Sequence, residues 1–250
     1  MISSILLKIN LTVSKQIFLF NETKMAKNIV FEPFVYPVDP SLFKVCGADE
    51  AGRGPLMGNV VAACVVLDRN NPIEGLNDSK QLSEKKRDAL EPLIKEKALA
   101  YGIGQCTPEE IDRMNILNAS LEAMKRAYEN MLLKCDLILV DGNKIIKNID
   151  IPCQAVVKGD ARVAEIAAAS ILAKVERDRQ MYELDRQYPQ YLFAKHKGYP
   201  TKQHLELLEK LPILPCYRKT YGPVRKVIEA KNIKKQNESF DSSSVNESLL

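Results

Sequence analysis

Two adjacent carboxylates, Asp49 and Glu50, lie in the glycine-rich segment Gly47–Gly54, which also contains Arg53. In a regular strand, adjacent side chains point to opposite faces of the sheet. We expect the glycines to let the backbone turn here, so that both carboxylates reach one site. Burying adjacent carboxylates without a cation is costly, so the segment indicates a cation site. A solvated turn is an alternative that the residue types alone leave equally open.

Two further acids follow apolar, strand-like runs. Asp141 comes directly after Leu137–Val140, where open α/β sheets bind their ligands. Asp160 follows Gly159 at the end of a second such run. Taken singly, Asp141 fits an ordinary Asp-Gly turn and Asp160 fits a cap of the following helix. Taken together with the acidic pair, they predict a cluster of four carboxylates.

The composition favours metal chemistry with oxygen ligands. The 250 residues include 36 Lys and Arg and 32 Asp and Glu, and the net charge of +4 permits a polyanionic partner without requiring one. Only two histidines are present, His196 and His204, so neither a histidine-rich zinc site nor a serine or cysteine nucleophile is favoured. Carboxylates favour Mg²⁺ or Mn²⁺, and such clusters are typical of phosphodiester hydrolysis.

Other features of the sequence bear on the cellular compartment of the protein. The six cysteines form no C-x-x-C pair, so we interpret them as free thiols and expect a cytoplasmic protein. No apolar run is long enough for a transmembrane helix, so no membrane association is expected. Lysines interrupt the apolar residues 1–20, and no small-residue cleavage site follows, which argues against a signal peptide. Met25 is a plausible alternative start.

Periodicity predicts the elements that must position these acids. Five strands are expected, at residues 45–48, 59–67, 98–106, 137–140 and 151–157. Ser83 starts a helix in which Pro92 predicts a kink or an early end. Thr107 caps one long helix whose apolar face continues to Tyr128. Further helices are expected at residues 162–187 and 203–211, so the class is α/β, with a mixed sheet flanked by helices.

The segment Asp49–Leu67, DEAGRGPLMGNVVAACVVL, resembles the signature of the ribonuclease HII family. Later motifs of the family follow in the same order, namely NDSK at 77–80, VDGN at 140–143, KGD at 158–160, AASILAK at 168–174 and HKGYPT at 196–201. The resemblance covers about residues 45–227 and implies a ribonuclease H-like five-stranded sheet with a small C-terminal helical appendage. By motif matching, it gives catalytic and metal-binding roles to four acids, Asp49, Glu50, Asp141 and Asp160.

The resemblance also implies residues that recognise the substrate. Gly52, Arg53 and Gly54 match the family element that recognises the ribonucleotide at an RNA–DNA junction, and Tyr199 matches the tyrosine that packs on the adjacent sugar. Glycines let the backbone approach a 2′-hydroxyl and a phosphate closely, while the guanidinium of Arg53 suits a phosphate. The alternative for Tyr199 is a structural role in the core of a loop.

Three basic residues, Lys80, Lys174 and Arg177, are weaker candidates for phosphate contacts, because each could equally face water. The chain also departs from the family pattern at two places. Pro200 stands where a glycine is usual, and Tyr217 precedes Arg218 where His-Arg is expected. Asp160 and the short N-terminal segment favour ribonuclease HII over ribonuclease HIII.

The activity implied is an endonuclease that hydrolyses the RNA strand of RNA–DNA hybrids and cuts 5′ of ribonucleotides embedded in duplex DNA. Two ions, Mn²⁺ or Mg²⁺, would assist, and the products would carry 5′-phosphate and 3′-hydroxyl ends. We expect a monomer with an N-terminal extension (1–43), a catalytic domain (44–188), a C-terminal helical substrate-binding region (189–230) and a disordered tail (231–250). The alternatives are a resolvase- or transposase-type nuclease, which would cut all-DNA substrates, and a binding module that would not cut.

Overall fold

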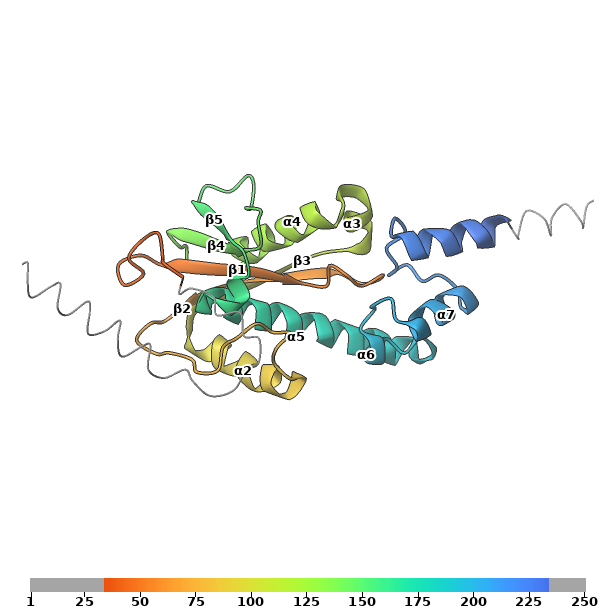
Figure 1. Cartoon of the computed structure of the whole chain (residues 1–250), viewed down its shortest axis with the longest axis horizontal. Helices are drawn as coiled ribbons and strands as arrows, with labels where there is room; N and C mark the ends of the chain where they lie inside the picture. Colours follow the sequence, from red (N-terminus) through yellow and green to blue (C-terminus); the bar gives the residue numbers. More distant parts are fainter. Residues whose placement is uncertain (1–33, 234–250) are drawn as a thin grey trace, which may run out of the picture. The chain divides into compact units, whose positions relative to one another are not determined.

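The computed structural model describes residues 34–233, which lie within one compact unit built around a five-stranded sheet (Figure 1). The strand order is β3-β2-β1-β4-β5. The strands are β1 (Val45–Ala51), β2 (Val60–Leu67), β3 (Ala98–Cys106), β4 (Leu137–Asp141) and β5 (Cys153–Val156). β1 pairs antiparallel with β2 and parallel with β4, so the sheet is mixed and the predicted fold class is confirmed.

Helices cover both faces of the sheet (Figure 1). Apolar side chains of α3 (Pro108–Met114) and α4 (Ile116–Glu129) pack on one face, and those of α2 (Glu84–Lys97) and α5 (Ala164–Gln187) pack on the other. The short 3-10 helix η1 (Gly159–Ala161) precedes α5. After α5 come η2 (Pro189–Tyr191), α6 (Phe193–His196), α7 (Lys202–Lys210) and a helical segment at residues 222–233.

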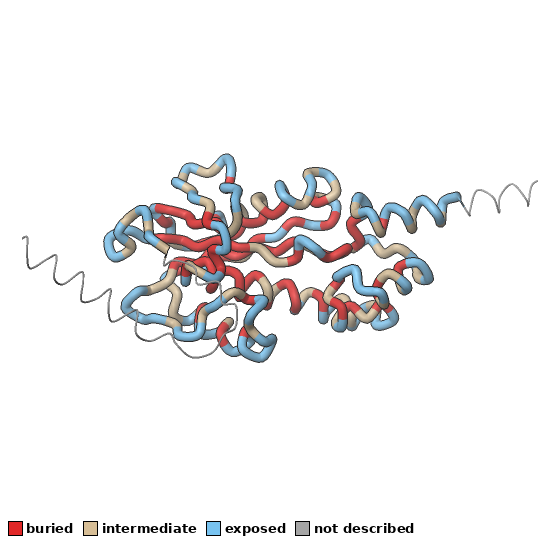
Figure 2. The backbone as a smooth tube through the Cα atoms, viewed as in Figure 1, coloured by how far each residue is buried: buried red, intermediate tan, exposed pale blue. Residues whose placement is uncertain are grey.

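Glycines let the long helices approach the sheet closely. A Cβ added at Gly104 of β3 would lie 2.3 Å from the carbonyl oxygen of Ala123 in α4. A Cβ at Gly47 of β1 would lie 2.2 Å from the backbone nitrogen of Ile166 in α5. The three central strands β1, β2 and β4 are almost continuously buried (Figure 2). Larger residues at these glycines would push the helices away from the strands that carry the acids.

One helix prediction is wrong, and one of the two alternatives expected at Pro92 is excluded. The long helix expected after Thr107 is two helices, because Asn115 adopts a φ of 68° and breaks the helical path. Asparagine tolerates this left-handed conformation, and its side chain accepts a hydrogen bond from the Asn118 N–H at 3.1 Å, which caps α4. The early end expected at Pro92 is also absent, since α2 continues to Lys97.

The chain on either side of the predicted catalytic domain packs against it. Of the predicted extension, residues 34–43 contribute Phe34, Tyr36 and Val38 to an apolar cluster on the sheet. At the other end, Leu56 and Met57 pack with apolar residues of the C-terminal helical region. Residues 231–233 of the predicted tail are helical. The rest of the tail and residues 1–33, with Met25, lie outside the described residues. None of the helices in residues 34–233 has the length and apolar character that crossing a bilayer requires.

Candidate active site

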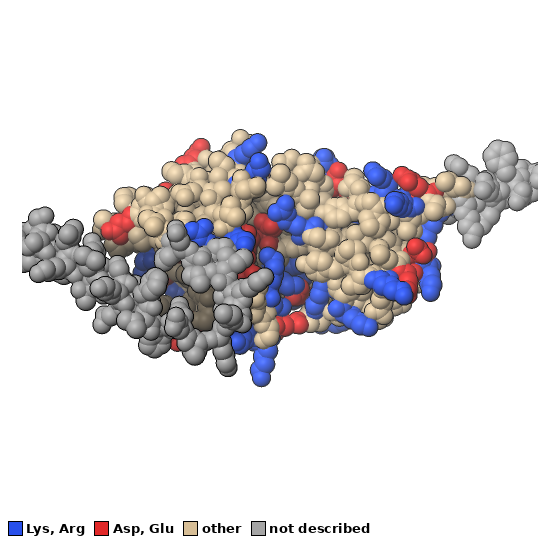
Figure 3. Space-filling model, in the orientation of Figure 1, with Lys and Arg blue, Asp and Glu red and all other residues tan. Residues whose placement is uncertain are grey.

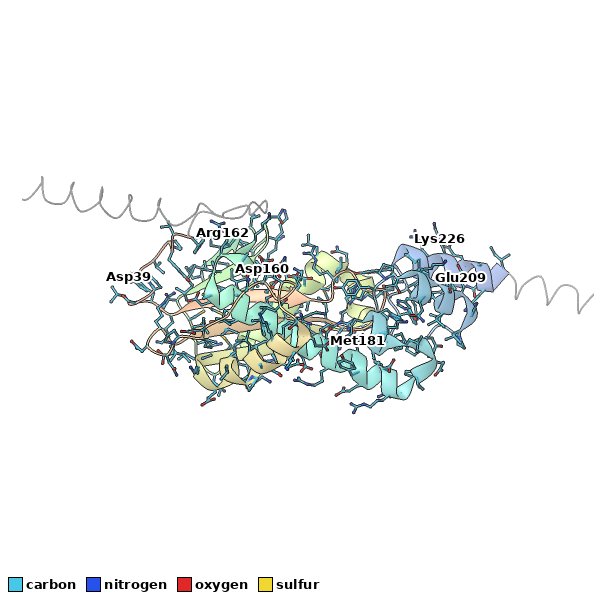
Figure 4. The ribbon with its side chains drawn as sticks, turned by 60° about the horizontal axis from the view of Figure 1, so that its bottom comes forward. Asp39, Asp160, Arg162, Met181, Glu209 and Lys226 are labelled. Carbon is cyan, nitrogen blue, oxygen red and sulfur yellow. The ribbon has the colours of Figure 1, made fainter. Side chains whose placement is uncertain are left out.

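Three carboxylates meet at one end of the sheet. Asp49 lies near the end of β1, and Asp141 is the last residue of β4. Asp160 lies in η1 (Figure 4). Because β1 and β4 are parallel neighbours that pair Ala48 with Val140, they bring Asp49 beside Asp141. One oxygen from each of the three carboxylates lies within 4.8 Å of the other two.

A backbone hydrogen bond connects two of these acids. The Gly159 N–H donates to Oδ1 of Asp141 at 2.8 Å, which fixes the start of η1 against the end of β4. Asp160 follows directly in η1 and does not cap α5, whose N-terminal residue Val163 makes no side-chain capping bond. The helix-capping alternative for Asp160 is therefore wrong, and its side chain is left to the acidic cluster.

Glu50 lies differently from the expectation. β1 does not turn at the acids but continues to Ala51, with Asp49 paired to Ala63 and Glu50 paired to Ala62 of β2. Adjacent strand residues point to opposite faces, so Glu50 is not part of the group of three. Its carboxylate, only 12% exposed, instead lies 3.4 Å from a guanidinium nitrogen of Arg53. The expected turn begins only at Gly52, where φ is 97°.

Burial and mutual repulsion raise the pKa values of carboxylates at this site. Burial, with repulsion from Glu50 and Asp141, raises the pKa of Asp49, although hydrogen bonds from Ser170 and the Glu50 N–H offset part of this. Burial also raises the pKa of Glu50 to about 7, with Asp141 adding to the rise and Arg53 opposing it. Burial and Asp141 raise the pKa of Asp160 to about 6. A divalent cation would relieve this repulsion, and all-oxygen ligands suit Mg²⁺ or Mn²⁺.

Basic side chains surround the acids, and Figure 3 shows lysines and arginines beside acidic residues across the middle of one face. The Lys80 ammonium is 74% exposed and lies 3.7 Å from Asp160. Burial alone would lower its pKa, but the nearby Asp49 and Asp160 raise it. Lys174 lies on α5 and forms an ion pair with Asp178 at 2.6 Å.

Residues 52–58, which begin at the end of the glycine-rich segment, form a loop beside the cluster. Arg53 has a half-exposed side chain, and Tyr199 is 44% exposed. A Cβ at Gly54 would lie 3.2 Å from Cε1 of Tyr199, so the tyrosine ring covers this glycine. The structure therefore brings the predicted junction element and the predicted sugar-packing tyrosine together, although they are far apart in the sequence.

Arg177 does not lie on the surface with Lys174. Its side chain is 2% exposed and donates to the Met57 carbonyl at 2.9 Å, beneath the loop. A Cβ at Gly52 would lie 2.9 Å from its Nε. A buried guanidinium cannot reach a phosphate in solvent, so Arg177 supports the loop from below.

Sequence reasoning missed the residues that hold this region together. Arg218 is fully buried and donates to several loop carbonyls. His204 connects the Tyr199 carbonyl to the Tyr217 hydroxyl, at 2.8 and 2.9 Å. The only signal in the sequence was the departure at Tyr217-Arg218, which did not reveal what these side chains contact.

Known proteins resemble the chain in both sequence and structure. The family model for ribonuclease HII matches residues 46–222. Ribonuclease HII of Vibrio campbellii is 58% identical over 207 residues, which are 83% of this chain and 96% of that protein. The crystal structure of ribonuclease H2 from Pyrococcus horikoshii has a TM-score of 0.64 and 33% identity, over 75% of this chain and 98% of that one.

Two further solved structures share the fold. The ribonuclease HII in a complex with PCNA from Archaeoglobus fulgidus has a TM-score of 0.58 and 27% identity, over 73% of this chain and 96% of that one. A ribonuclease HIII in complex with Mn²⁺ has a TM-score of 0.61 at 17% identity, over 75% of this chain and 70% of that one, which shows a shared fold only.

Proposed function

Since the chain belongs to the ribonuclease HII family, it is a metal-dependent endonuclease acting on the RNA of RNA–DNA hybrids, and we propose that Asp49, Glu50, Asp141 and Asp160 are its catalytic residues. The observation that carries the assignment of Asp49, Asp141 and Asp160 is the meeting of their carboxylates within 4.8 Å. Glu50 is assigned by the family motif, and its electrostatic interaction with Asp141 supports this. The raised pKa values of Asp49 and Asp160 support a site built for cations, because without a cation the charges repel each other.

Mg²⁺ or Mn²⁺ is the proposed cofactor, and Asp49 and Asp141 are its proposed anchors, with Asp160 and Glu50 completing the ligand set. A divalent ion bound there supplies Lewis-acid stabilisation and makes water a better nucleophile. The protein itself fixes the carboxylates: the Glu50 N–H donates to Asp49 at 2.7 Å and the Gly159 N–H donates to Asp141 at 2.8 Å. These bonds hold oxygen atoms towards the cluster and reduce the reorganisation that metal binding would otherwise require.

We propose that selectivity for RNA comes from Gly52, Arg53, Gly54 and Tyr199. Gly54 is exposed and its backbone lies against the Tyr199 ring, and an exposed backbone beside an aromatic ring suits a sugar with a 2′-hydroxyl. Arg53 is half exposed and suits a phosphate. Lys80 and Lys174 flank the cluster as further phosphate contacts, while Arg177 acts from beneath the loop.

The proposed substrates are RNA–DNA hybrids and duplex DNA with an embedded ribonucleotide, cut on the 5′ side of the ribonucleotide to leave 5′-phosphate and 3′-hydroxyl ends. We also propose that the protein acts as a monomer in the cytoplasm. All six cysteines are free thiols, which fits a reducing compartment.

One assay tests this function. The purified protein is incubated with Mg²⁺ or Mn²⁺ and a labelled DNA duplex that holds one ribonucleotide, beside an all-DNA duplex of the same sequence. We expect one cut, 5′ of the ribonucleotide, and an intact all-DNA control. Cleavage of both duplexes would indicate a resolvase-type nuclease, and binding without cleavage would indicate a binding module.

A further inference from the structure

Two buried arginines lie beneath the loop formed by residues 52–58. Arg177 of α5 is 2% exposed and Arg218 is 0% exposed. Within residues 34–233, neither forms an ion pair with a carboxylate. Burial, and then the charge of Arg218, lowers the pKa of Arg177 to about 10, so Arg177 remains protonated near neutral pH. Burial also lowers the pKa of Arg218. Buried charges without an opposite charge are costly, so their retention needs an explanation.

The backbone of the loop is the main partner of both arginines. Arg218 donates to the carbonyl oxygens of Gly52 at 2.6 Å, Pro55 at 2.7 Å, Gly58 at 2.8 Å and Arg53 at 3.1 Å. Arg177 donates to the carbonyl oxygen of Met57 at 2.9 Å. Five carbonyl groups of one short loop thus point inward, toward two positive charges.

This arrangement determines where the loop N–H groups point. In a trans peptide, the C=O group and the N–H group of the next residue point in opposite directions, and the described chain has no cis peptide. With the carbonyls of Gly52 and Arg53 held inward, the N–H groups of Arg53 and Gly54 point outward. Neither N–H donates a hydrogen bond within residues 34–233, whereas Leu56 and Gly58 donate theirs to the carbonyls of Gly198 and Cys216.

The outer side of the loop therefore suits an anion. Consecutive outward N–H groups form an anion-binding concavity, and the half-exposed Arg53 side chain adds a charge beside it. Beneath the loop, Nε and Nη1 of Arg177 have no hydrogen-bond partner. The Asp178 carboxylate offsets part of the charge of Arg177, and the remainder adds to the potential on the side where a phosphate would bind.

We propose that Arg218, assisted by Arg177, positions the loop for substrate recognition by aiming the N–H groups of Arg53 and Gly54 at a phosphate of the nucleic-acid backbone. Neither arginine touches the substrate; each acts through the loop. The inference rests on the proposed function, and it names the buried groups that give the loop its shape and charge.

The test compares Arg218→Lys with the wild type on the single-ribonucleotide duplex with Mn²⁺, measuring kcat and KM at several salt concentrations. Lysine keeps the charge but cannot bond to four carbonyls in a fork. Loss of the aimed N–H groups should raise KM about tenfold to a hundredfold, with kcat near that of the wild type. The dependence of log KM on log salt should become shallower by about one unit, because a displaced loop also moves the Arg53 guanidinium away from its phosphate.

Arg126→Lys is the matched control. Arg126 lies on α4 and also donates to a backbone carbonyl, that of Gln105 at 2.8 Å, but it contacts neither the loop nor the acidic cluster. Its replacement should lower the melting temperature without changing KM or the salt dependence. A merely structural role of Arg218 would give the same result as this control.

A folded Arg218→Lys protein with the KM and salt dependence of the wild type would overturn the inference. If circular dichroism shows that this variant does not fold, Arg177→Met is measured instead. We expect it to have a raised KM and a shallower salt dependence. Wild-type values of both would overturn the proposal. An inactive wild type would instead overturn the proposed function, and this inference with it. The two failures are therefore distinguishable.

Discussion

The ring of Tyr199 covers the α-carbon of Gly54, so closely that a Cβ on this glycine would lie 3.2 Å from Cε1 of the ring. The two residues come from opposite ends of the domain and form one wall beside the acidic cluster. A methyl group at position 54 would move the ring by a few tenths of an ångström. The spacing between the loop backbone and the tyrosine is thus sensitive to the smallest side chain.

Gly54→Ala should therefore weaken recognition of the ribonucleotide while the protein stays folded. Position 54 does not have the positive φ that would make alanine strained, so little stability should be lost. Displacing the ring should lower kcat/KM on the single-ribonucleotide duplex by up to about tenfold. The control is Gly222→Ala, because a Cβ there meets nothing within 4 Å. Unchanged kcat/KM in Gly54→Ala would show that the ring does not pack on the substrate.

The acidic cluster predicts an unusual dependence of stability on pH in the metal-free protein. Burial raises the pKa of Asp49, Glu50 and Asp160, so the folded state holds protons that the unfolded state has released. Between the unfolded values near pH 4 and the folded value of Glu50 near pH 7, the contribution of these carboxylates to the free energy of unfolding should fall as pH rises. Melting temperatures in EDTA across this range measure the effect.

Asp49→Asn serves as the comparison for that experiment, because it removes one charge from the cluster. The difference in melting temperature between variant and wild type should grow as pH rises. His204, whose pKa burial lowers to about 4, destabilises both proteins equally at low pH and cancels from the difference. Mn²⁺ should stabilise the wild type most at high pH, where protons compete least for the carboxylates. A difference that does not vary with pH would contradict the repulsion.

The hydrogen bonds that connect Tyr217, His204 and Tyr199 should contribute to the stability of the protein. Nδ1 of His204 donates to the Tyr199 carbonyl, so in the neutral ring Nε2 accepts from the Tyr217 hydroxyl. Tyr217→Phe leaves Nε2 buried without a partner and should reduce the free energy of unfolding by about 1–3 kcal/mol. Urea denaturation measures this free energy, and Tyr101→Phe, which changes a partly exposed ring, is the control. Equal stabilities of the two variants would show that this bond contributes nothing.

The sequence predicted which acids belong to the site, but not the backbone structure that carries them. Glycines around Asp49 and Glu50 indicated a turn, yet β2 provides strand partners for both residues and β1 continues through them. Only pairing with another strand decides this, and it is not visible in the local sequence. For the same reason, the boundary of the long helix was missed at Asn115, a residue that helices also accept in their interior.

Contacts between residues that lie far apart in the sequence could not be predicted from the sequence. The spacing of Arg177 from Lys174 indicated a shared helix face, but the loop of residues 52–58 covers Arg177 from 120 positions away. Arg218 bonds to the same loop from as many as 166 positions away. The resemblance to a family supplied the carboxylates and Tyr199, whereas the groups that position them became visible only once the chain was folded.

The central claim is that the four carboxylates do the cutting, and Asp141→Asn tests it most directly. The variant keeps the shape of the side chain and removes the charge, so the protein should fold. Its rate of cutting a single-ribonucleotide duplex with Mn²⁺ should fall by more than about a hundredfold, beyond the usual effect of residues that only support a metal site. Asp150→Asn, at an exposed aspartate, should cut like the wild type. Near-wild-type cleavage by folded Asp141→Asn would contradict the assignment.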